Sequence, residues 1–336
     1  MELDIYQLIR FMQIFNRGVI MQQVKNILYS TLFIIGLGLF LLGASLIVIP
    51  KNNLDVFGMD NLSANGILGE KENSIDVLVI GDSESYSAIT PMQLWNDHGI
   101  TSYVCGTSGQ LLTESKYFLL QAFEKQKPKL VILETDAIYR NFSLATALTN
   151  IFENKLPIFK YHNRWKSLKV IDFGGDVEYT WRDDYKGYSY STVVAKADDS
   201  NYMTYSDQIQ KINKINENYV LDMAKFCQEN GVTFMLLSTP STINWNYPRH
   251  NGISQFVNEH QIPYLDLNLP QTSPGIDWNQ DSRDQGDHLN HYGAKKVTSY
   301  LGDYLKNNFQ LGDHRNDENY QSWNEAYQRY LQSTSH

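Results

Sequence analysis

A run of 23 residues without a charged side chain, from Ile27 to Ile49, constrains this 336-residue chain more than any other feature. As an α-helix it would be about 34 Å long, enough to cross the hydrocarbon core of a bilayer. The run has no polar face for a soluble helix to expose. It is also longer than the apolar core of about 7–15 residues in a signal peptide. We therefore expect an uncleaved transmembrane helix over residues 27–49.

The charges on either side of this span predict its orientation. Arg10, Arg17 and Lys25 precede the span, and Lys51 follows it. The positive-inside rule then predicts a cytoplasmic segment at residues 1–26 and an extracytoplasmic body, in a single-pass protein of the cell membrane. Residues 1–26 are moderately amphipathic, so they either lie along the inner membrane surface or form a frayed tail.

Composition excludes several classes of function. The chain has 28 basic and 37 acidic residues, a net charge of −9, so it lacks the basic excess that a nucleic-acid partner would need. Two cysteines exclude a disulfide framework and a Cys-rich zinc site. Cys105 and Cys227 could pair with each other or be buried thiols. No cluster of His, Asp and Glu has zinc-ligand spacing, so we predict no metal and no cofactor.

Behind a polar linker at residues 50–73, short apolar runs alternate with helical patterns. Strands are expected at 75–80, 102–105, 129–134, 232–238 and 263–267, and helices at 91–98, 111–126, 207–230, 253–260 and 293–309. Apolar strands separated by helices predict an α/β fold, with a parallel sheet covered on both faces. Five strands fit a flavodoxin-like order, in which ligands bind at the carboxyl ends of the strands.

An insertion at residues 137–206 interrupts the alternation. Fourteen of its 70 residues are aromatic. It could be a lid, a glycan platform or a satellite subdomain with a core of its own. Within it His162, Arg164 and Trp165 are candidates for contacting an anionic or sugar group, with a surface turn as the alternative reading.

The C-terminal segment, residues 313–336, predicts an amphipathic helix that packs on the body. Tyr320, Trp323, Tyr327 and Leu331 are spaced to share one face of such a helix.

Two motifs that lie far apart in the sequence could carry the chemistry. Asp82 and Ser83 directly follow the first expected strand, and the run 284–290 (DQGDHLN) precedes the last expected helix. A serine at the carboxyl end of a strand is exposed beside helix-start N–H groups, which can stabilise an oxyanion. His288 belongs to the same rim of the sheet, and a neighbouring aspartate can hold its imidazole in one tautomer.

This pair of motifs resembles the first and last signature blocks of the SGNH/GDSL hydrolase superfamily. The resemblance implies a three-layer α/β/α domain over residues 74–312, with Ser83 as nucleophile and His288 as general base. The family pattern Asp-x-x-His would place the acid at position 285, which is Gln285. We favour Asp284, because a spacing of four residues in a helical turn brings side chains to one face. Asp287 is the alternative acid.

The same resemblance implies an oxyanion hole built from the amides of Ser83 and Gly109, with Gly106 as an alternative to Gly109. The family also carries an asparagine after the third strand. The sequence here reads Glu-Thr-Asp, so Asp136 or Asn141 could supply that donor.

A membrane span joined to such a body resembles extracytoplasmic acyl-transfer proteins, those of lipoteichoic acid D-alanylation and polysaccharide O-acetylation. This implies an acyl donor, an envelope glycan or polyol acceptor, and a multi-pass membrane O-acyltransferase as partner. We expect a serine O-acyltransferase or esterase. The alternative is a catalytically degenerate scaffold that binds glycan or docks onto that acyltransferase.

Overall fold

The computed structural model describes residues 5–335, apart from the side chains of residues 11 and 13–18. A five-stranded sheet has the order β2-β1-β3-β4-β5, and every pair of neighbouring strands is parallel. The strands are β1 (Val77–Gly81), β2 (Ser102–Gly106), β3 (Leu130–Glu134), β4 (Thr233–Ser238) and β5 (Tyr264–Asp266). This is the flavodoxin-like order, so the predicted α/β sheet is confirmed.

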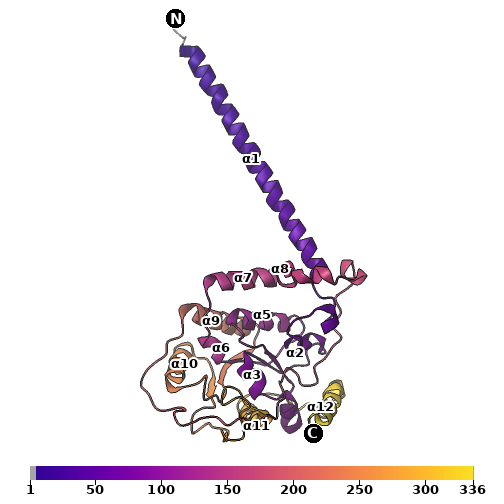
Figure 1. The fold of residues 1–336 in the computed structure, drawn as a ribbon, viewed down its shortest axis with the longest axis vertical. Coiled ribbons are helices and arrows are strands. Elements are labelled where there is room, and N and C mark those ends of the chain that lie inside the picture. Colours follow the sequence, from indigo (N-terminus) through magenta and orange to yellow (C-terminus); the bar gives the residue numbers. More distant parts are fainter. Residues whose placement is uncertain (1–4, 336) are drawn as a thin grey trace. The chain divides into compact units, whose positions relative to one another are not determined.

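Helices cover both faces of the sheet, which makes three layers (Figure 1). Leu78 and Ile80 of β1 belong to the core beneath α5 and α9, whereas Val77 and Val79 belong to the core beneath α3, α4 and α11. Successive side chains of a strand point to opposite faces, so β1 is apolar throughout. The covering helices are α3 (Ser83–Ala88), α4 (Pro91–His98), α5 (Leu112–Phe123), α9 (Lys214–Glu229) and α11 (His291–Asn308).

The structure has further helices besides these covering ones. They are α1 (Ile5–Val48), α2 (Leu62–Asn65), α6 (Asp136–Tyr139), α7 (Leu144–Lys155), α8 (Pro157–Tyr161), α10 (Tyr247–His260) and α12 (Gln321–Thr334). The 3₁₀ helices are η1 (Asp55–Phe57), η2 (Gly66–Gly69), η3 (His162–Lys166), η4 (Val170–Phe173) and η5 (Glu318–Tyr320).

The chain divides into two compact units. One comprises Met1–Ile49 with Phe152–Asp176, and the other comprises Pro50–Ile151 with Val177–His336. The first contains α1, of which Val19–Val48 is long and apolar enough to cross a membrane. The predicted segment 1–26 and span 27–49 form one unbroken helix from Ile5 onward, without the turn that a surface-lying segment would need. Residues 1–4 of that segment lie outside the described residues.

The predicted linker at residues 50–73 is wrong, because this segment is folded into the second unit. Ile67 is buried in the core, Asn53 Nδ2 donates to the Trp181 carbonyl at 2.7 Å, and the Tyr103 hydroxyl donates to the Ser63 carbonyl at 2.7 Å. The apolar residues among its asparagines and glycines therefore fill part of the core rather than interrupt a flexible tether.

The insertion is not a single satellite subdomain, since it divides between the two units. In the second unit its chain runs along the edge strand β2, where Val104 N donates to the Lys186 carbonyl at 2.9 Å. A buried ion pair of 2.7 Å joins Lys186 to Glu70. Gly187 has φ +87°, and a Cβ there would lie 1.9 Å from the Val104 carbonyl oxygen. The segment therefore covers an otherwise exposed strand edge.

Two expected helix starts are wrong, and one expected helix face is right only in part. Helix α9 begins at Lys214 rather than at 207, because the side chain of Asn213 caps it by accepting from Asn216 N at 2.9 Å. Helix α10 begins at Tyr247 rather than at 253, with a proline in its first turn, where a missing N–H costs nothing. On α12 the buried residues are Trp323, Ala326 and Tyr330. Of the predicted stripe, Trp323 is buried and Tyr320 and Tyr327 are half-buried against the same core, whereas Leu331 is exposed.

The two cysteines are free and buried. Cys105 lies in β2 and Cys227 in α9, and both belong to the same apolar core. The disulfide alternative is therefore wrong, and both cysteines are buried thiols.

Candidate active site

Ser83 stands at the switch point of the sheet, where the strand order reverses between β1 and β3. Strand β1 ends at Gly81, and Asp82 caps α3 by accepting from Glu84 N at 3.0 Å. Ser83 is therefore the first residue of α3, and its side chain is largely buried. Cap formation at Asp82 fixes where the helix starts and so where the serine hydroxyl lies.

The predicted acid–base pair forms on the loop before α11. Asp284 Oδ2 lies 2.5 Å from His288 Nδ1, and Asp284 Oδ1 accepts from the His288 backbone N at 2.6 Å. The loop is not helical, contrary to the reasoning that favoured Asp284. It reverses through two positive φ angles, +67° at Gln285 and +100° at Gly286. The turn therefore accommodates one residue more between Asp284 and His288 than the family pattern Asp-x-x-His contains.

Asp287, the alternative acid, holds a different position. Its Oδ2 is 3.5 Å from His288 Nδ1, and its Oδ1 accepts from Asn244 Nδ2 at 2.6 Å. Asp284 is thus the carboxylate in hydrogen-bond contact with the ring, and Asp287 is turned toward Asn244.

The second nitrogen of His288 is the distinctive atom of the site. Nε2 is buried and has no hydrogen-bond partner among the described residues. Because Nδ1 faces a carboxylate, we assign the ring proton to Nδ1, which leaves a lone pair on Nε2. That tautomer is the one a general base needs.

The two distant motifs converge. Arg283 Nη2 donates to Ser87 Oγ of α3 at 2.7 Å, and one nitrogen, Asn244 Nδ2, donates to both Glu84 Oε1 and Asp287 Oδ1. The histidine loop therefore contacts the helix that Ser83 begins. Since His288 Nε2 is unpartnered, the hydrogen bond between Ser83 Oγ and His288 is not formed in this structure.

A segment after β4, residues 241–245, holds the histidine loop and was missed in the sequence. Ser241 Oγ donates to the Asp287 carbonyl at 2.9 Å, and Thr242 N donates to the Gly286 carbonyl at 2.9 Å. Asn244 supplies the bridge to Glu84. The only signal was a run of small polar residues after a strand, which also describes an ordinary loop.

The candidate oxyanion donors differ in their surroundings. Gly106 belongs to β2 and pairs with Gly81, whereas Gly109 lies in the following turn with φ +64° and open space where a Cβ would be. Asp136 accepts from Arg140 Nη2 at 2.9 Å and Arg249 Nη1 at 2.7 Å, so it is engaged as an acceptor rather than a donor.

The other third-block candidate, Asn141, faces the start of α9. Its Oδ1 accepts from Asn213 Nδ2 at 2.7 Å. Gly109 therefore remains our preferred partner for the Ser83 amide.

Four acidic side chains, Asp82, Glu84, Glu134 and Asp136, crowd the rim next to Ser83, and the pKa values of the first three are raised. Burial, then the nearby Asp136, raises the pKa of Asp82 to about 7, although Arg140 opposes the shift. Burial, followed by the charges of Glu134 and Asp82, raises the pKa of Glu84 well above its usual value. Burial, followed by the charges of Asp82 and Asp136, also raises the pKa of Glu134 well above its usual value. A proton is therefore held at this rim near neutral pH.

The structure brings together one cluster of candidate metal ligands that spacing along the chain could not reveal. Ligand atoms of Glu84, Asp287 and His288 all lie within 4.8 Å of one another. Two of these residues are close in sequence, but Glu84 comes from α3. The prediction that no metal is bound stays a prediction.

The three candidates for contacting an anionic or sugar group, His162, Arg164 and Trp165, lie in the unit that contains α1. Arg164 is buried, donating to the Val48 carbonyl and to Asp172 Oδ1, the latter at 2.9 Å. Its guanidinium is thus engaged in packing that unit. His162 and Trp165 are exposed, and a role for them in binding substrate stays a prediction.

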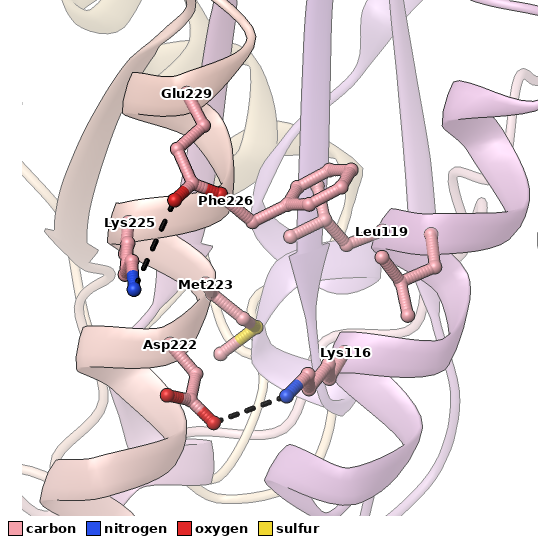
Figure 2. Close-up of a pocket in the computed structure, with 8 residues that line it drawn as sticks. Lys116, Leu119, Asp222, Met223, Lys225, Phe226 and Glu229 are labelled. Atoms are coloured by element: carbon pink, nitrogen blue, oxygen red, sulfur yellow. Dashed lines mark hydrogen bonds and ion pairs between the residues drawn. The ribbon is translucent and has the colours of Figure 1, made fainter.

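Among the hollows of the second unit, two stand close to the elements described above. One, of about 540 Å³, is lined by residues that include Tyr86 of α3, Gly106–Ser108 after β2, and Ser189 of the insertion. The other, of about 240 Å³, lies between α5 and α9 (Figure 2). Its polar groups include the ion pair Lys116–Asp222, and it contains none of the predicted site residues.

A second Ser–His–Asp set joins α10 to the end of β5. Ser254 Oγ lies 3.3 Å from His250 Nε2, and His250 Nδ1 lies 2.7 Å from Asp266 Oδ2. Asp266 also accepts from Trp245 Nε1 and the Tyr264 hydroxyl. Ser254 stands inside a helix, where backbone N–H groups are consumed by helical bonds and cannot form an oxyanion hole. We assign this set to structure.

No family model and no curated protein matches the sequence. Solved structures that it resembles include a GDSL-like lipase from Bacteroides thetaiotaomicron VPI-5482, at 14% identity and a TM-score of 0.33, covering 69% of this chain and 87% of that chain. A psychrotrophic esterase from Pseudoalteromonas sp. has 12% identity and a TM-score of 0.35, covering 69% and 97%. A lipase/acylhydrolase from Enterococcus faecalis has 13% identity and a TM-score of 0.30, covering 71% and 99%. These likenesses carry no argument about the site, which rests on its own side chains.

Proposed function

We propose that this chain is a serine O-acyltransferase or esterase, anchored in the cell membrane by α1, with its catalytic unit outside the cytoplasm. Its acceptor is a cell-envelope polysaccharide or a teichoic-acid-type polymer. A multi-pass membrane O-acyltransferase that delivers the acyl group is the proposed partner.

One observation carries the chemical part of this proposal. His288 is held by Asp284 through Nδ1, while Nε2 is buried and unpartnered on a loop that contacts α3. A buried acceptor without a partner is costly, so such an atom is typical of a site that awaits a proton donor. Ser83, at the start of α3, is the proposed donor.

In the proposed reaction, Ser83 Oγ forms a bond to the acyl carbonyl carbon as its proton moves to His288 Nε2. The carbonyl electron pair moves to the oxygen, which the amides of Ser83 and Gly109 stabilise. Collapse breaks the bond to the donor alcohol, which takes the proton from His288 and leaves an acyl-Ser83 ester. An acceptor hydroxyl or water, deprotonated by His288, then attacks the acyl carbonyl; the bond between the acyl group and Ser83 Oγ breaks, and Oγ takes the proton back from His288.

The hollow of about 540 Å³ supports a polyol acceptor. Its lining includes the hydroxyl groups of Thr107, Ser108 and Ser189, the ring of Tyr86 and one carboxylate, that of Asp55, and no lysine or arginine is among the lining residues. Hydroxyl groups and an aromatic ring suit a neutral polyhydroxylated ligand. The hollow also adjoins the turn that contains Gly109.

The degenerate scaffold remains the second candidate, and one observation favours it. The hydrogen bond between Ser83 and His288 is not formed here. Catalytic hydrogen bonds are often long in the absence of substrate. The unformed bond between Ser83 and His288 therefore agrees equally with an enzyme in which this bond forms when substrate binds.

A serine-reactive fluorophosphonate probe separates the two candidates. We expect the full chain to be labelled, with labelling lost in Ser83→Ala and in His288→Ala. Ser254→Ala is the matched control, because Ser254 also faces a histidine but lacks an oxyanion hole. Absence of labelling in the wild-type chain, or its persistence in Ser83→Ala, would contradict the proposed enzyme.

A further inference from the structure

The segment Phe152–Asp176 forms one compact unit with α1. Helix α8 and the 3₁₀ helices η3 and η4 pack against α1. Arg164, paired with the buried Asp172, donates to the carbonyl of Val48, the last residue of α1. The guanidinium therefore satisfies a carbonyl that a helix end leaves open.

The segment 152–176 contacts α1 close to the C-terminal end of that helix. Ile158 N donates to Ser45 Oγ at 3.1 Å, three residues before the helix ends. A rise of 1.5 Å per residue puts Ser45 about 4.5 Å from the end of the helix axis. If α1 crosses the bilayer as proposed, this is the depth at which headgroups meet hydrocarbon, where interfacial helices bury their apolar sides.

The segment exposes large apolar side chains among its exposed polar ones. Six of its large apolar side chains are exposed: Phe152, Phe159, Trp165, Val170, Ile171 and Phe173. Val170 is 93% exposed and Trp165 is 66% exposed. Single exposed apolar residues are ordinary, but six within 25 consecutive residues form a surface that needs a cover. Tryptophan and phenylalanine beside the end of a span are typical of a membrane interface.

The charge of the segment differs from that of the rest of the chain. It has five basic and three acidic residues, a net charge of +2, whereas the whole chain carries −9, so the remaining residues carry −11. Exposed lysines, Lys155 and Lys166 among them, accompany the apolar side chains. Lysines next to a membrane span attract anionic headgroups.

We propose that Phe152–Asp176 lies in the outer membrane interface, with its apolar side chains among the lipids and its lysines at anionic headgroups. This proposal rests on the proposed membrane anchor. It gives the chain a second lipid contact, fastened to the end of the span by Arg164.

Spin labels on the full chain in vesicles of phosphatidylcholine and phosphatidylglycerol test this contact. The label is placed at Val170→Cys, at the matched exposed valine Val193→Cys in the other unit, and at Phe40→Cys in α1. The two native thiols are buried and do not compete for the label. Power saturation then compares collisions with oxygen, which enriches in lipid, and with a water-soluble nickel complex.

We expect the label at Val170 to favour oxygen, like that at Phe40, while the label at Val193 favours nickel. A nickel preference at Val170 with Phe40 still in lipid would overturn the interfacial segment and leave the anchor intact. A nickel preference at both positions would overturn the anchor and the segment together. Protection of Val170 from both reagents would assign the surface to a protein contact and overturn the lipid proposal.

Discussion

At the scale of single residues, Asp284 and Asp287 form a matched pair around one imidazole. Asp284 contacts Nδ1 at 2.5 Å, whereas Asp287 is bonded to Asn244. We predict that Asp284→Asn lowers kcat for ester hydrolysis by about 10³–10⁴-fold, because the amide favours the wrong tautomer. Asp287→Asn should leave kcat within about one order of magnitude. Steady-state kinetics of both variants would contradict this assignment if Asp287→Asn had the larger effect.

The raised pKa of Glu84 predicts how the free energy of unfolding depends on pH. Its pKa is raised in the folded state, first by burial and then by Glu134 and Asp82. The stabilisation from neutral Glu84 is therefore complete below the unfolded pKa and is lost as pH rises through the folded pKa. Glu84→Gln cannot lose a proton, so it should gain stability relative to wild type between pH 5 and pH 8. Urea unfolding of both chains in detergent, followed by near-UV circular dichroism, measures this. Identical pH dependence in the two chains would contradict the prediction.

Ser83 and His288 could be found from the sequence, because each lies beside a recognisable element boundary at the sheet rim. The turn that lets Asp284 reach His288 could not be predicted from the sequence. It needs a positive φ at Gln285, and a glutamine rarely adopts one. The contact of Asn244 with Glu84 was equally hidden, because it joins residues 160 positions apart.

At the scale of elements, the packing of α9 against α5 offers an energetic contrast (Figure 2). Met223 is fully buried beneath α9, whereas the ion pair between Lys116 and Asp222 lies in solvent. We predict that Met223→Ala lowers the free energy of unfolding by about 2–5 kcal/mol, through lost burial and a cavity. Lys116→Met should change it by less than about 1 kcal/mol, because exposed ion pairs contribute little. Chemical denaturation gives both values, and equal losses would contradict the layer arrangement.

Strands were predictable to within about two residues, because each is a short apolar run and both faces of the sheet are buried. The boundaries of the helices were harder to predict than those of the strands. The capping asparagine, Asn213, sits inside a polar stretch with no apolar period, so nothing but the cap itself marks the start of α9. On α12 the expected stripe holds for Trp323, which is buried and packs against Trp95 with ring centroids 5.5 Å apart, but Leu331 is exposed, and Ala326 and Tyr330 complete the buried face.

At the scale of the whole molecule, orientation in the membrane is the open prediction. The bias of positive charges predicts a cytoplasmic N-terminus and a catalytic unit outside the cytoplasm. In intact cells, a membrane-impermeant maleimide should label Val193→Cys, whereas Leu8→Cys should be labelled only after permeabilisation. Burial raises the pKa of the Cys227 thiol to about 12, and Cys105 is also buried, so both native cysteines stay unreactive. The reverse labelling pattern would contradict the proposed location.

The division into two units could not be predicted, because it unites α1 with residues more than a hundred positions later. The aromatic content of the insertion marked it as unusual. Which of its residues fill a core and which cover β2 depends on contacts that no local pattern encodes.

The proposed chemistry depends on one intermediate, in which Ser83 carries the acyl group between its release from the donor and its transfer to the acceptor or to water. The direct measurement is rapid acid quenching of the full chain during turnover of p-nitrophenyl acetate, followed by peptide mapping by mass spectrometry. We predict an acetyl group on the peptide that contains Ser83, absent in His288→Ala, where the base is missing. An acetylated Ser254 peptide, or turnover with no acetyl group on Ser83, would contradict the account.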